Sequence, residues 1–195
     1  NLLFAILKKF FNVYILIIKK MNLKDHIRSI PDYPKKGILF RDITTLIKNE
    51  IAFAESIDLI IKKSKNFKID KIAAIESRGF VFASAVSYLL KKPFIMLRKK
   101  NKLPAETHSV DFELEYGTAT IEVHKDSINK DDSVLVIDDL IATGGTAKAA
   151  AKLIELSKGQ VAGFVFVINL FDLGGCESLI KDGYKVENLI EFPGH

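Results

Sequence analysis

The chain has 195 residues, of which 48% are hydrophobic and 27% are charged. These proportions are those of a globular protein with a sizeable core, so they exclude disordered, collagen-like and disulfide-stapled chains. The single cysteine, Cys176, rules out a disulfide within the chain and fits a reducing, cytoplasmic compartment. The net charge of +5 is spread over separate lysine pairs. We therefore expect a solvated basic surface and anionic small substrates, with no nucleic-acid partner.

Residues 1–20 differ from the rest because they are apolar and basic and contain no acid. Lys8 and Lys9 interrupt the apolar run, whereas a membrane-spanning helix needs about 20 largely uncharged residues. No small-residue cleavage site of a signal peptide follows. We expect a non-native extension, translated from upstream sequence, with the true start at Met21 and a single domain over residues 21–195. The alternative is a disordered or amphipathic segment that lies on a membrane surface.

In the first half of the domain, apolar periodicity and turn residues predict the elements. Pro31 and Pro34 are expected to end the first of them. In chain order the expected elements are a helix over 23–30, an extended segment over 37–41, a helix over 51–67, a strand over 69–76, a helix over 80–90 and a strand over 93–97.

Residues 98–113 show no clear periodicity and begin with a basic run. Structureless segments of this length are usually functional or disordered, so we expect a lid over a reacting centre. The elements expected after it are strands over 118–124 and 134–137, a helix over 146–157, a strand over 161–170, a helix over 177–182 and a strand over 184–190. Alternating strands and helices predict a single α/β domain with a mostly parallel central sheet flanked by helices.

The most informative stretch runs from Val134 to Ile154. An apolar strand is followed by Asp138 and Asp139, then by small and hydroxylic residues that open a helix. Backbone N–H groups at such a glycine-rich helix start form a phosphate site, and the two acids suit the hydroxyl groups of a ribose. The spacing matches neither a P-loop nor a GxGxxG dinucleotide fingerprint. The pattern therefore predicts a site for a sugar phosphate.

A second turn, Ser77-Arg78-Gly79, joins the strand over 69–76 to the next helix. Its N–H groups face a further phosphate position, and Arg78 adds a cation with bidentate reach. On these residues alone, an ordinary surface arginine explains Arg78 equally well.

The stretch VLVIDDLIATGGTA resembles the phosphoribosyl-pyrophosphate signature of the type I phosphoribosyltransferases, and its ATGGT variant is similar to that of the adenine-specific members. Other segments extend the resemblance in the order of that family over most of residues 21–195. They are DYPKKGILFRDIT (32–44), ESRGF (76–80), RKKNKLPAET (98–107), LEYGTATIEVHKD (114–126), INLFDLGG (168–175) and FPGH (192–195).

The resemblance implies a type I phosphoribosyltransferase fold with a flexible active-site loop. It also implies conversion of adenine and 5-phosphoribosyl 1-pyrophosphate (PRPP) to AMP and pyrophosphate in purine salvage. Mg²⁺ would be bound mainly through PRPP, without a metal site built by the protein alone. The implied partners are the two substrates and a second copy of the chain in a homodimer.

Site residues are carried over position by position. The resemblance assigns adenine to Leu39, Phe40, Arg41 and Leu173. It makes Glu115 the catalytic candidate at the base, beside Asp138 and Asp139 at the ribose. The residues assigned to PRPP are Arg78, Arg98, Lys99, Lys102, Asp138, Asp139, Ala142, Thr143, Gly144, Gly145 and Thr146.

Two other functions share parts of this pattern. A phosphoribosyltransferase for hypoxanthine and guanine, orotate or xanthine would keep the PRPP site, although GILFRD and the Asp-Asp pair argue against it. A DNA-binding regulator that senses PRPP on the same fold would normally add a helix-turn-helix domain, which 20 residues before Met21 cannot hold.

Overall fold

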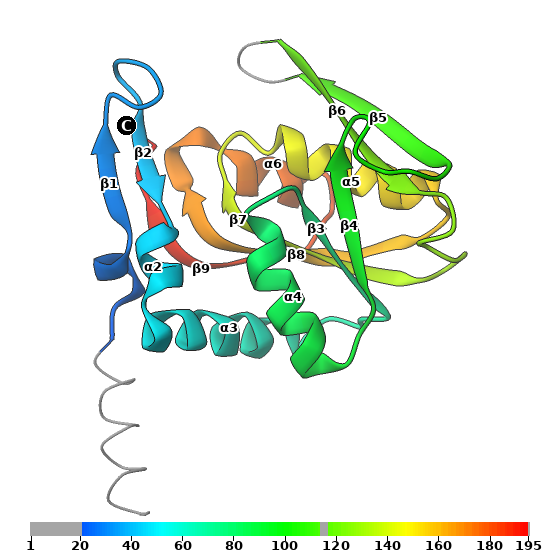
Figure 1. The fold of residues 1–195 in the computed structure, drawn as a ribbon, viewed down its shortest axis with the longest axis horizontal. Helices are drawn as coiled ribbons and strands as arrows, with labels where there is room; N and C mark the ends of the chain where they lie inside the picture. The colour runs from blue at the N-terminus through cyan, green and yellow to red at the C-terminus, as the bar shows by residue number, and fades with distance from the viewer. Residues whose placement is uncertain (1–20, 114–116, 195) are drawn as a thin grey trace, which may run out of the picture. The chain divides into compact units, whose positions relative to one another are not determined.

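The computed structural model describes residues 21–113 and 117–194 (Figure 1). The expected extension over residues 1–20 and the catalytic candidate Glu115 lie outside the described residues. The domain boundary at Met21 and the role of Glu115 therefore stay predictions. The chain divides into two compact units, one that ends at Asp58 and one that begins at Leu59. Within the described residues, no helix is long and apolar enough to cross a membrane.

The first unit contains a two-stranded antiparallel hairpin and short helices. Its elements are η1 (Leu23–His26), β1 (Arg28–Pro31), β2 (Leu39–Asp42), α2 (Thr44–Lys48) and the first part of α3 (Glu50–Ser64).

The predicted helix over residues 23–30 is wrong beyond His26, because Arg28–Pro31 forms β1. This strand pairs with β2, with Ser29 opposite Arg41. Arg28 Nη2 also lies 2.5 Å from the buried carboxylate of Asp42. Pairing with a distant segment therefore overrides the weak local preference for a helix.

The second unit is built on a sheet that has seven strands within the described residues, in the order β5-β6-β4-β3-β7-β8-β9 (Figure 1). The strands are β3 (Lys71–Ile75), β4 (Phe94–Lys99), β5 (Thr107–Glu113), β6 (Thr118–His124), β7 (Ser133–Ile141), β8 (Gln160–Leu170) and β9 (Val186–Phe192). The adjacent strands β4, β3, β7, β8 and β9 pair in parallel. The pairings of β6 with β4 and with β5 are antiparallel. The prediction of a mostly parallel sheet is confirmed.

Helices cover both faces of this sheet (Figure 1). α4 (Gly79–Leu90) lies on one face, while α5 (Gly145–Leu156) and α6 (Gly175–Lys181) lie on the other. Val134 and Val136 of β7 pack with Leu153 and Ile154 of α5 in the main core cluster. Leu135 and Ile137 alternate with them and are also fully buried. A strand buried on both faces explains the uninterrupted apolar run at this point of the sequence.

The expected loop over residues 98–113 contains regular structure. Residues 94–99 belong to β4, and residues 107–113 form β5, which pairs with β6 in a hairpin with Thr107 opposite His124. The prediction of a structureless segment is therefore wrong for β5. The signal that was missed is the alternation of the apolar Val110 and Phe112 with three exposed polar residues, which is typical of a strand with one covered face.

The strand order determines where a ligand can bind. From β3 the chain continues to β4 on one side, whereas β7 lies on the other side of β3 and is followed outward by β8 and β9. This reversal is a topological switch point, and ligands of open α/β sheets bind at the carboxyl ends of the strands there. Glu76 follows β3 and Asp138 lies at the end of the β3–β7 pairing, so both lie at this crevice.

Candidate active site

Asp138 and Asp139 occupy the part of β7 that extends past its neighbour. The pairing of β7 with β3 ends at Ile137, whereas its pairing with β8 continues to Ile141. The backbone N–H of Asp139 donates to Asp138 Oδ1 over 2.9 Å. Asp139 is 4% exposed, and Asp138 is half-buried. The two carboxylates thus lie at the carboxyl edge of the sheet, as the sequence predicts.

Both acids have raised pKa values. Burial raises the pKa of Asp138 well above its ordinary value, and the charge of Asp139 raises it further. Burial also raises the pKa of Asp139, against the opposing effect of the Arg78 guanidinium. Hydrogen bonds from the hydroxyl groups of a ligand would replace part of the lost solvation and stabilise the charged pair.

Arg78 connects the two turns that the sequence assigns to phosphate groups. Its Nε lies 2.8 Å from Asp139 Oδ2. The side chain of Arg78 is 46% exposed, while that of Asp139 is 5% exposed. The arginine therefore joins an almost buried acid to a position open to solvent.

Gly79, the first residue of α4, allows this helix to approach the acids. A Cβ atom at Gly79 would lie 2.6 Å from Asp138 Oδ1 and 3.0 Å from the Ile137 carbonyl oxygen. Any side chain here would displace Asp138 or the neighbouring backbone of β7. The peptide bond between Glu76 and Ser77, in the same turn, is cis.

The loop from Ala142 to Thr146 leads into the N-terminus of α5. Gly144 has φ +88°, a conformation that favours glycine, and no side chain caps the helix start within the described residues. A Cβ atom at Gly175 would lie 2.3 Å from the Ala142 carbonyl oxygen and 2.9 Å from the Gly144 nitrogen. The start of α6 therefore packs directly on the loop. An uncapped N-terminus on a 12-residue helix is a favourable place for a phosphate group.

The basic residues after β4 are connected to the turn after β3 through Glu76. Arg98 donates from Nη2 to Glu76 Oε1 and from Nε to Glu76 Oε2, each over 3.2 Å. The backbone N–H of Lys99 donates to Glu76 Oε2 over 3.0 Å. Arg98 Nη1 also donates to the Lys102 carbonyl oxygen over 3.0 Å. Hydrogen bonds from Arg98 lower the pKa of Glu76, so this carboxylate stays charged.

The structure therefore brings the residues predicted for PRPP into one neighbourhood in the second unit. Asp139 contacts Arg78, and Arg78 lies two positions after Glu76, which holds Arg98. The roles of Glu76, Gly79 and Gly175 were missed by sequence reasoning. All three stand in the quoted motifs ESRGF and INLFDLGG. Their contacts join distant segments, so only the folded chain reveals them.

The residues predicted to bind the base come from both units. Leu39, Phe40 and Arg41 form most of β2 in the first unit. Arg41 is buried, and its Nη1 donates to Ser29 Oγ over 2.5 Å. In the second unit, Leu173 ends the short helix η2 (Phe171–Leu173), and a Cβ atom at Gly194 would lie 2.7 Å from its Cγ.

Cys176 lies at the start of α6 and is buried. Burial, with a smaller effect of the charges of Glu177 and Glu191, raises the pKa of its thiol to about 11. The thiol therefore stays protonated at neutral pH, and its side chain packs in the core cluster of the second unit.

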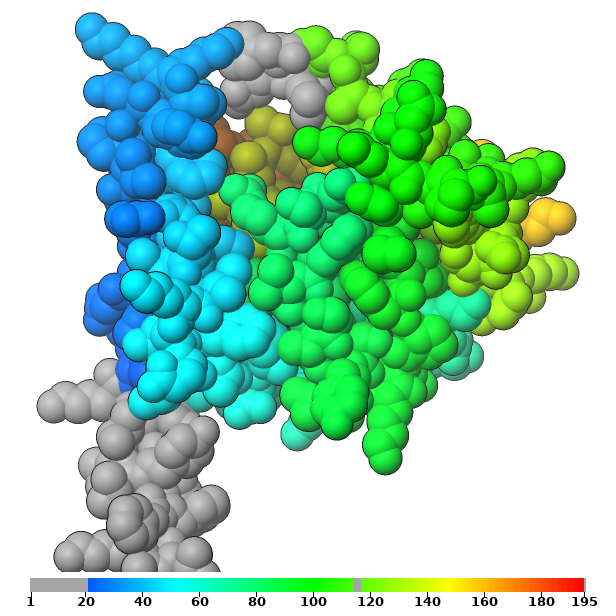
Figure 2. Space-filling model, viewed as in Figure 1, coloured from blue at the N-terminus to red at the C-terminus, as the bar shows by residue number. Residues whose placement is uncertain are grey.

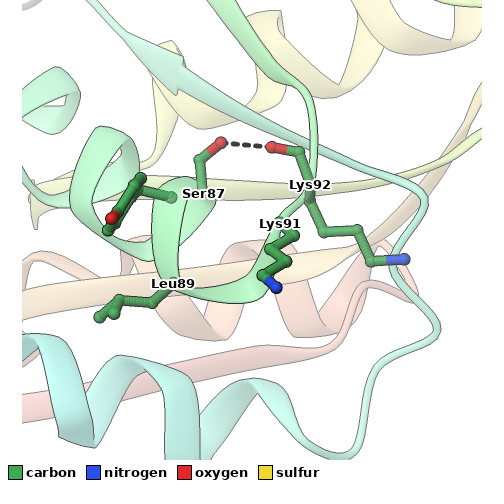
Figure 3. A pocket seen from close by; sticks show the side chains of 5 residues that line it. Ser87, Leu89, Lys91 and Lys92 are labelled. Atoms are coloured by element: carbon green, nitrogen blue, oxygen red, sulfur yellow. Dashed lines mark hydrogen bonds between the residues drawn. The ribbon is translucent and has the colours of Figure 1, made fainter.

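A separate pocket lies at the far end of α4 (Figure 3). The hydroxyl of Ser87 donates to the Lys92 carbonyl oxygen at this pocket. A helix of 12 residues, about 18 Å long, separates it from Gly79 and hence from Asp138. The lining residues are Ser87, Tyr88, Leu89, Lys91 and Lys92. This pocket contains no acid or glycine-rich turn, so it is not the site for the sugar phosphate.

Comparison with known proteins identifies the class of this fold and site. The family model described as the phosphoribosyl transferase domain matches residues 42–191, which include β3, β7 and the loop after it. The chain belongs to the phosphoribosyltransferase family.

Relatives with high sequence identity show to which branch of the phosphoribosyltransferase family the chain belongs. Over 175 residues the chain is 83% identical to adenine phosphoribosyltransferase of Pelagibacter ubique, covering 90% of this chain and 100% of that protein. It is 53% identical over 173 residues to the Haemophilus ducreyi enzyme of the same name, covering 89% and 97%. The crystal structure of adenine phosphoribosyltransferase from Thermoanaerobacter pseudethanolicus has a TM-score of 0.84 at 47% identity, covering 87% of this chain and 98% of that one. These similarities place the chain in the adenine phosphoribosyltransferase branch of the family.

Proposed function

We propose that this protein transfers the phosphoribosyl group of PRPP to adenine, giving AMP and pyrophosphate. The observation that carries the proposal is the arrangement at the switch point. Asp138 and Asp139 lie there beside Arg78 and precede the uncapped N-terminus of α5. The similarity to named adenine phosphoribosyltransferases supports the same reaction. In this reaction adenine N9 forms a bond to C1 of the ribose as the bond from C1 to the pyrophosphate oxygen breaks.

The ribose 5-phosphate part of PRPP fits the segment from Asp138 to Thr146. A phosphate group at the start of α5 accepts hydrogen bonds from the loop N–H groups and interacts favourably with the helix dipole. The ribose hydroxyls donate to Asp138 and Asp139. The two charges also stabilise the positive charge that develops at C1 as the leaving group departs.

The pyrophosphate fits the cations at the ends of β3 and β4. Arg78, Lys99 and Lys102 are exposed enough to meet it. Arg98 is held by Glu76, so its direct contribution is smaller unless the pair rearranges. Among the described residues, no three or more His, Cys, Asp or Glu side chains gather to hold a metal. Mg²⁺ would be bound mainly by PRPP oxygens and water, with at most Asp138 and Asp139 nearby, and it would neutralise charge on the leaving group.

Adenine recognition is assigned to β2 and Leu173. Pro31 faces Leu39 in the hairpin and has no N–H, so β1 offers the Leu39 carbonyl no ladder hydrogen bond. That carbonyl is suited to accept from the adenine amino group, while the Arg41 N–H donates to a ring nitrogen. Phe40 stacks on the base. Hypoxanthine presents an acceptor where adenine has its donor, so this pair of backbone groups discriminates against it. Glu115 would assist proton movement at the imidazole side of the base.

An assay with four different bases tests the proposal directly. The purified chain is given PRPP and Mg²⁺ with adenine, hypoxanthine, guanine or orotate, and pyrophosphate release is followed. We expect release with adenine only. Release with another base would keep the PRPP site and overturn the assignment of β2, and release with none would overturn the proposed reaction.

Asp139→Asn tests the role of the acids within the same assay. Removing one charge that stabilises the reacting centre should lower turnover by about 100-fold or more. The circular dichroism spectrum should stay unchanged, because asparagine keeps the shape of the side chain. Asp131→Asn is the matched control, since Asp131 is exposed and its φ of +66° suits asparagine. Full turnover in Asp139→Asn would contradict the assignment.

We also propose that the protein is a homodimer. α4 carries apolar residues on its outer face as well as its inner one, and this outer face is open in the space-filling view (Figure 2). Val81, Tyr88 and Leu89 are 37%, 82% and 53% exposed. A helix that is apolar on all sides is usually buried, and a second copy would cover this face. Light scattering should give twice the monomer mass for the wild type and a monomer for Leu89→Glu. A monomeric wild type would overturn this proposal.

A further inference from the structure

The turn that joins β1 to β2 contains an aromatic side chain that has no assigned role. Tyr33 and Phe40 form an edge-to-face pair with ring centroids 5.1 Å apart and an interplanar angle of 75°. Tyr33 is 53% exposed, whereas Phe40 is half-buried. Within the first unit, Tyr33 is therefore packed against the residue to which base stacking is assigned.

Hydrogen bonds on both sides of the turn hold the backbone of Tyr33. Its N–H donates to the Ile38 carbonyl oxygen over 3.3 Å. The preceding residue, Asp32, accepts from the Gly37 N–H at Oδ1 over 2.7 Å. Asp32 and Gly37 have φ values of +56° and +88°, which aspartate and glycine tolerate. The turn thus holds the backbone of Tyr33 in the position from which its ring contacts Phe40.

An edge-to-face contact restricts the plane of the Phe40 ring. Phe40 lies on β2 opposite Ile30, so its backbone is fixed by the hairpin, but a phenylalanine ring also rotates about its own axis. Because one ring presents its edge to the face of the other, rotation of Phe40 breaks the favourable quadrupole arrangement. A base that stacks on Phe40 needs that plane to be fixed before it binds.

We propose that Tyr33 is a positioning residue for adenine recognition, because it holds the plane of Phe40. This inference rests on the proposed function, in which Phe40 stacks on the base. Tyr33 itself need not touch the substrate. Its aromatic ring carries the effect and its hydroxyl does not, since the described contact is between the two rings.

The test compares Tyr33→Leu with Tyr33→Phe. Leucine removes the aromatic edge and keeps apolar bulk, so KM for adenine should rise about three- to tenfold, the range of an aromatic pair. The KM for PRPP and kcat should change by less than about twofold, since they depend on the second unit. Tyr33→Phe should restore the wild-type KM for adenine. Lys36→Ala, an exposed change in the same turn, is the matched control and should leave both KM values unchanged.

A double-mutant cycle separates positioning from a general loss of structure. In a Phe40→Leu background, Tyr33→Leu should add little to the KM for adenine, because the ring that it positions is gone. A purely structural role would lower the melting temperature and raise both KM values in either background. That result would overturn the inference, and so would a wild-type KM for adenine in Tyr33→Leu. No turnover of adenine by the wild-type protein would instead overturn the proposed function itself.

Discussion

At the scale of single residues, Asp138 shows how a candidate active-site residue can lower stability. It lies next to Asp139, where burial and the second charge raise its pKa. A group whose pKa is raised on folding binds its proton more tightly in the folded state. The free energy of unfolding therefore falls as pH rises from the ordinary carboxyl pKa of about 4 through the raised value.

Asp138→Asn should accordingly stabilise the protein while it removes activity. At pH 7 the melting temperature of the variant should exceed that of the wild type, because a neutral amide replaces a charge that burial destabilises. The difference should shrink toward pH 4, where the wild-type carboxyl is also protonated. Melting curves recorded by circular dichroism at several pH values measure this. A lower melting temperature for the variant at pH 7 would show that burial is not the dominant effect.

Glu76 is the residue whose contacts explain the placement of the basic segment after β4. It accepts from Arg98 and from the Lys99 N–H. Glu76→Gln weakens these charge-assisted hydrogen bonds, so the KM for PRPP should rise roughly tenfold, while the KM for adenine stays near the wild-type value. Glu106→Gln is the control, because its ion pair with Lys125 is exposed and contributes little. An equal KM for PRPP in the two variants would show that Glu76 does not position the basic segment for PRPP binding.

At the scale of elements, the loop from Ala142 to Thr146, to which we assign the phosphate, depends on the close approach of α6. The helix starts at Gly175, whose position leaves no room for a methyl group beside Ala142 and Gly144. The strand-to-helix turn is local, but its exact shape is set by a helix that begins about 30 residues later.

Gly175→Ala should weaken PRPP binding and also destabilise the fold by about 1–3 kcal/mol, because the added methyl group pushes the loop away. Gly183→Ala separates the two effects. Gly183 has φ +90° and no atom within 4 Å of the added Cβ, so alanine there is strained but displaces nothing. For both variants, isothermal calorimetry measures the affinity for PRPP, and chemical denaturation measures the free energy of unfolding. Weaker PRPP binding in Gly183→Ala alone would contradict the proposed role of the α6 contact.

At the scale of the whole molecule, a bound anion should stabilise the folded chain by mass action. PRPP at about 100 times its Kd should add about 2.7 kcal/mol, which for a protein of this size raises the melting temperature by roughly 5–10 °C. The shift should be much smaller in Arg78→Ala, which lacks the guanidinium beside Asp139. Differential scanning fluorimetry with Mg²⁺ and PRPP measures it. An equal shift in Arg78→Ala would remove this arginine from the binding site.

What the sequence determined by itself is local. Val134 to Thr146 predicted a strand, two acids and a helix start, and the structure has them as β7, its extension and α5. The α/β class and the mostly parallel sheet were also correct. Such features follow from neighbours along the chain, because periodicity, glycine content and helix starts act over a few residues.

Only the tertiary structure decided which of these elements meet. It formed β1 where a helix was predicted and paired β5 with β6 where a loop was predicted. It also put β3 between β7 and β4, and so joined Asp139 to Arg78 and Glu76 to Arg98. Each of these contacts links segments that are distant in sequence. Their formation depends on how whole elements bury their apolar faces together, which no single stretch of residues encodes.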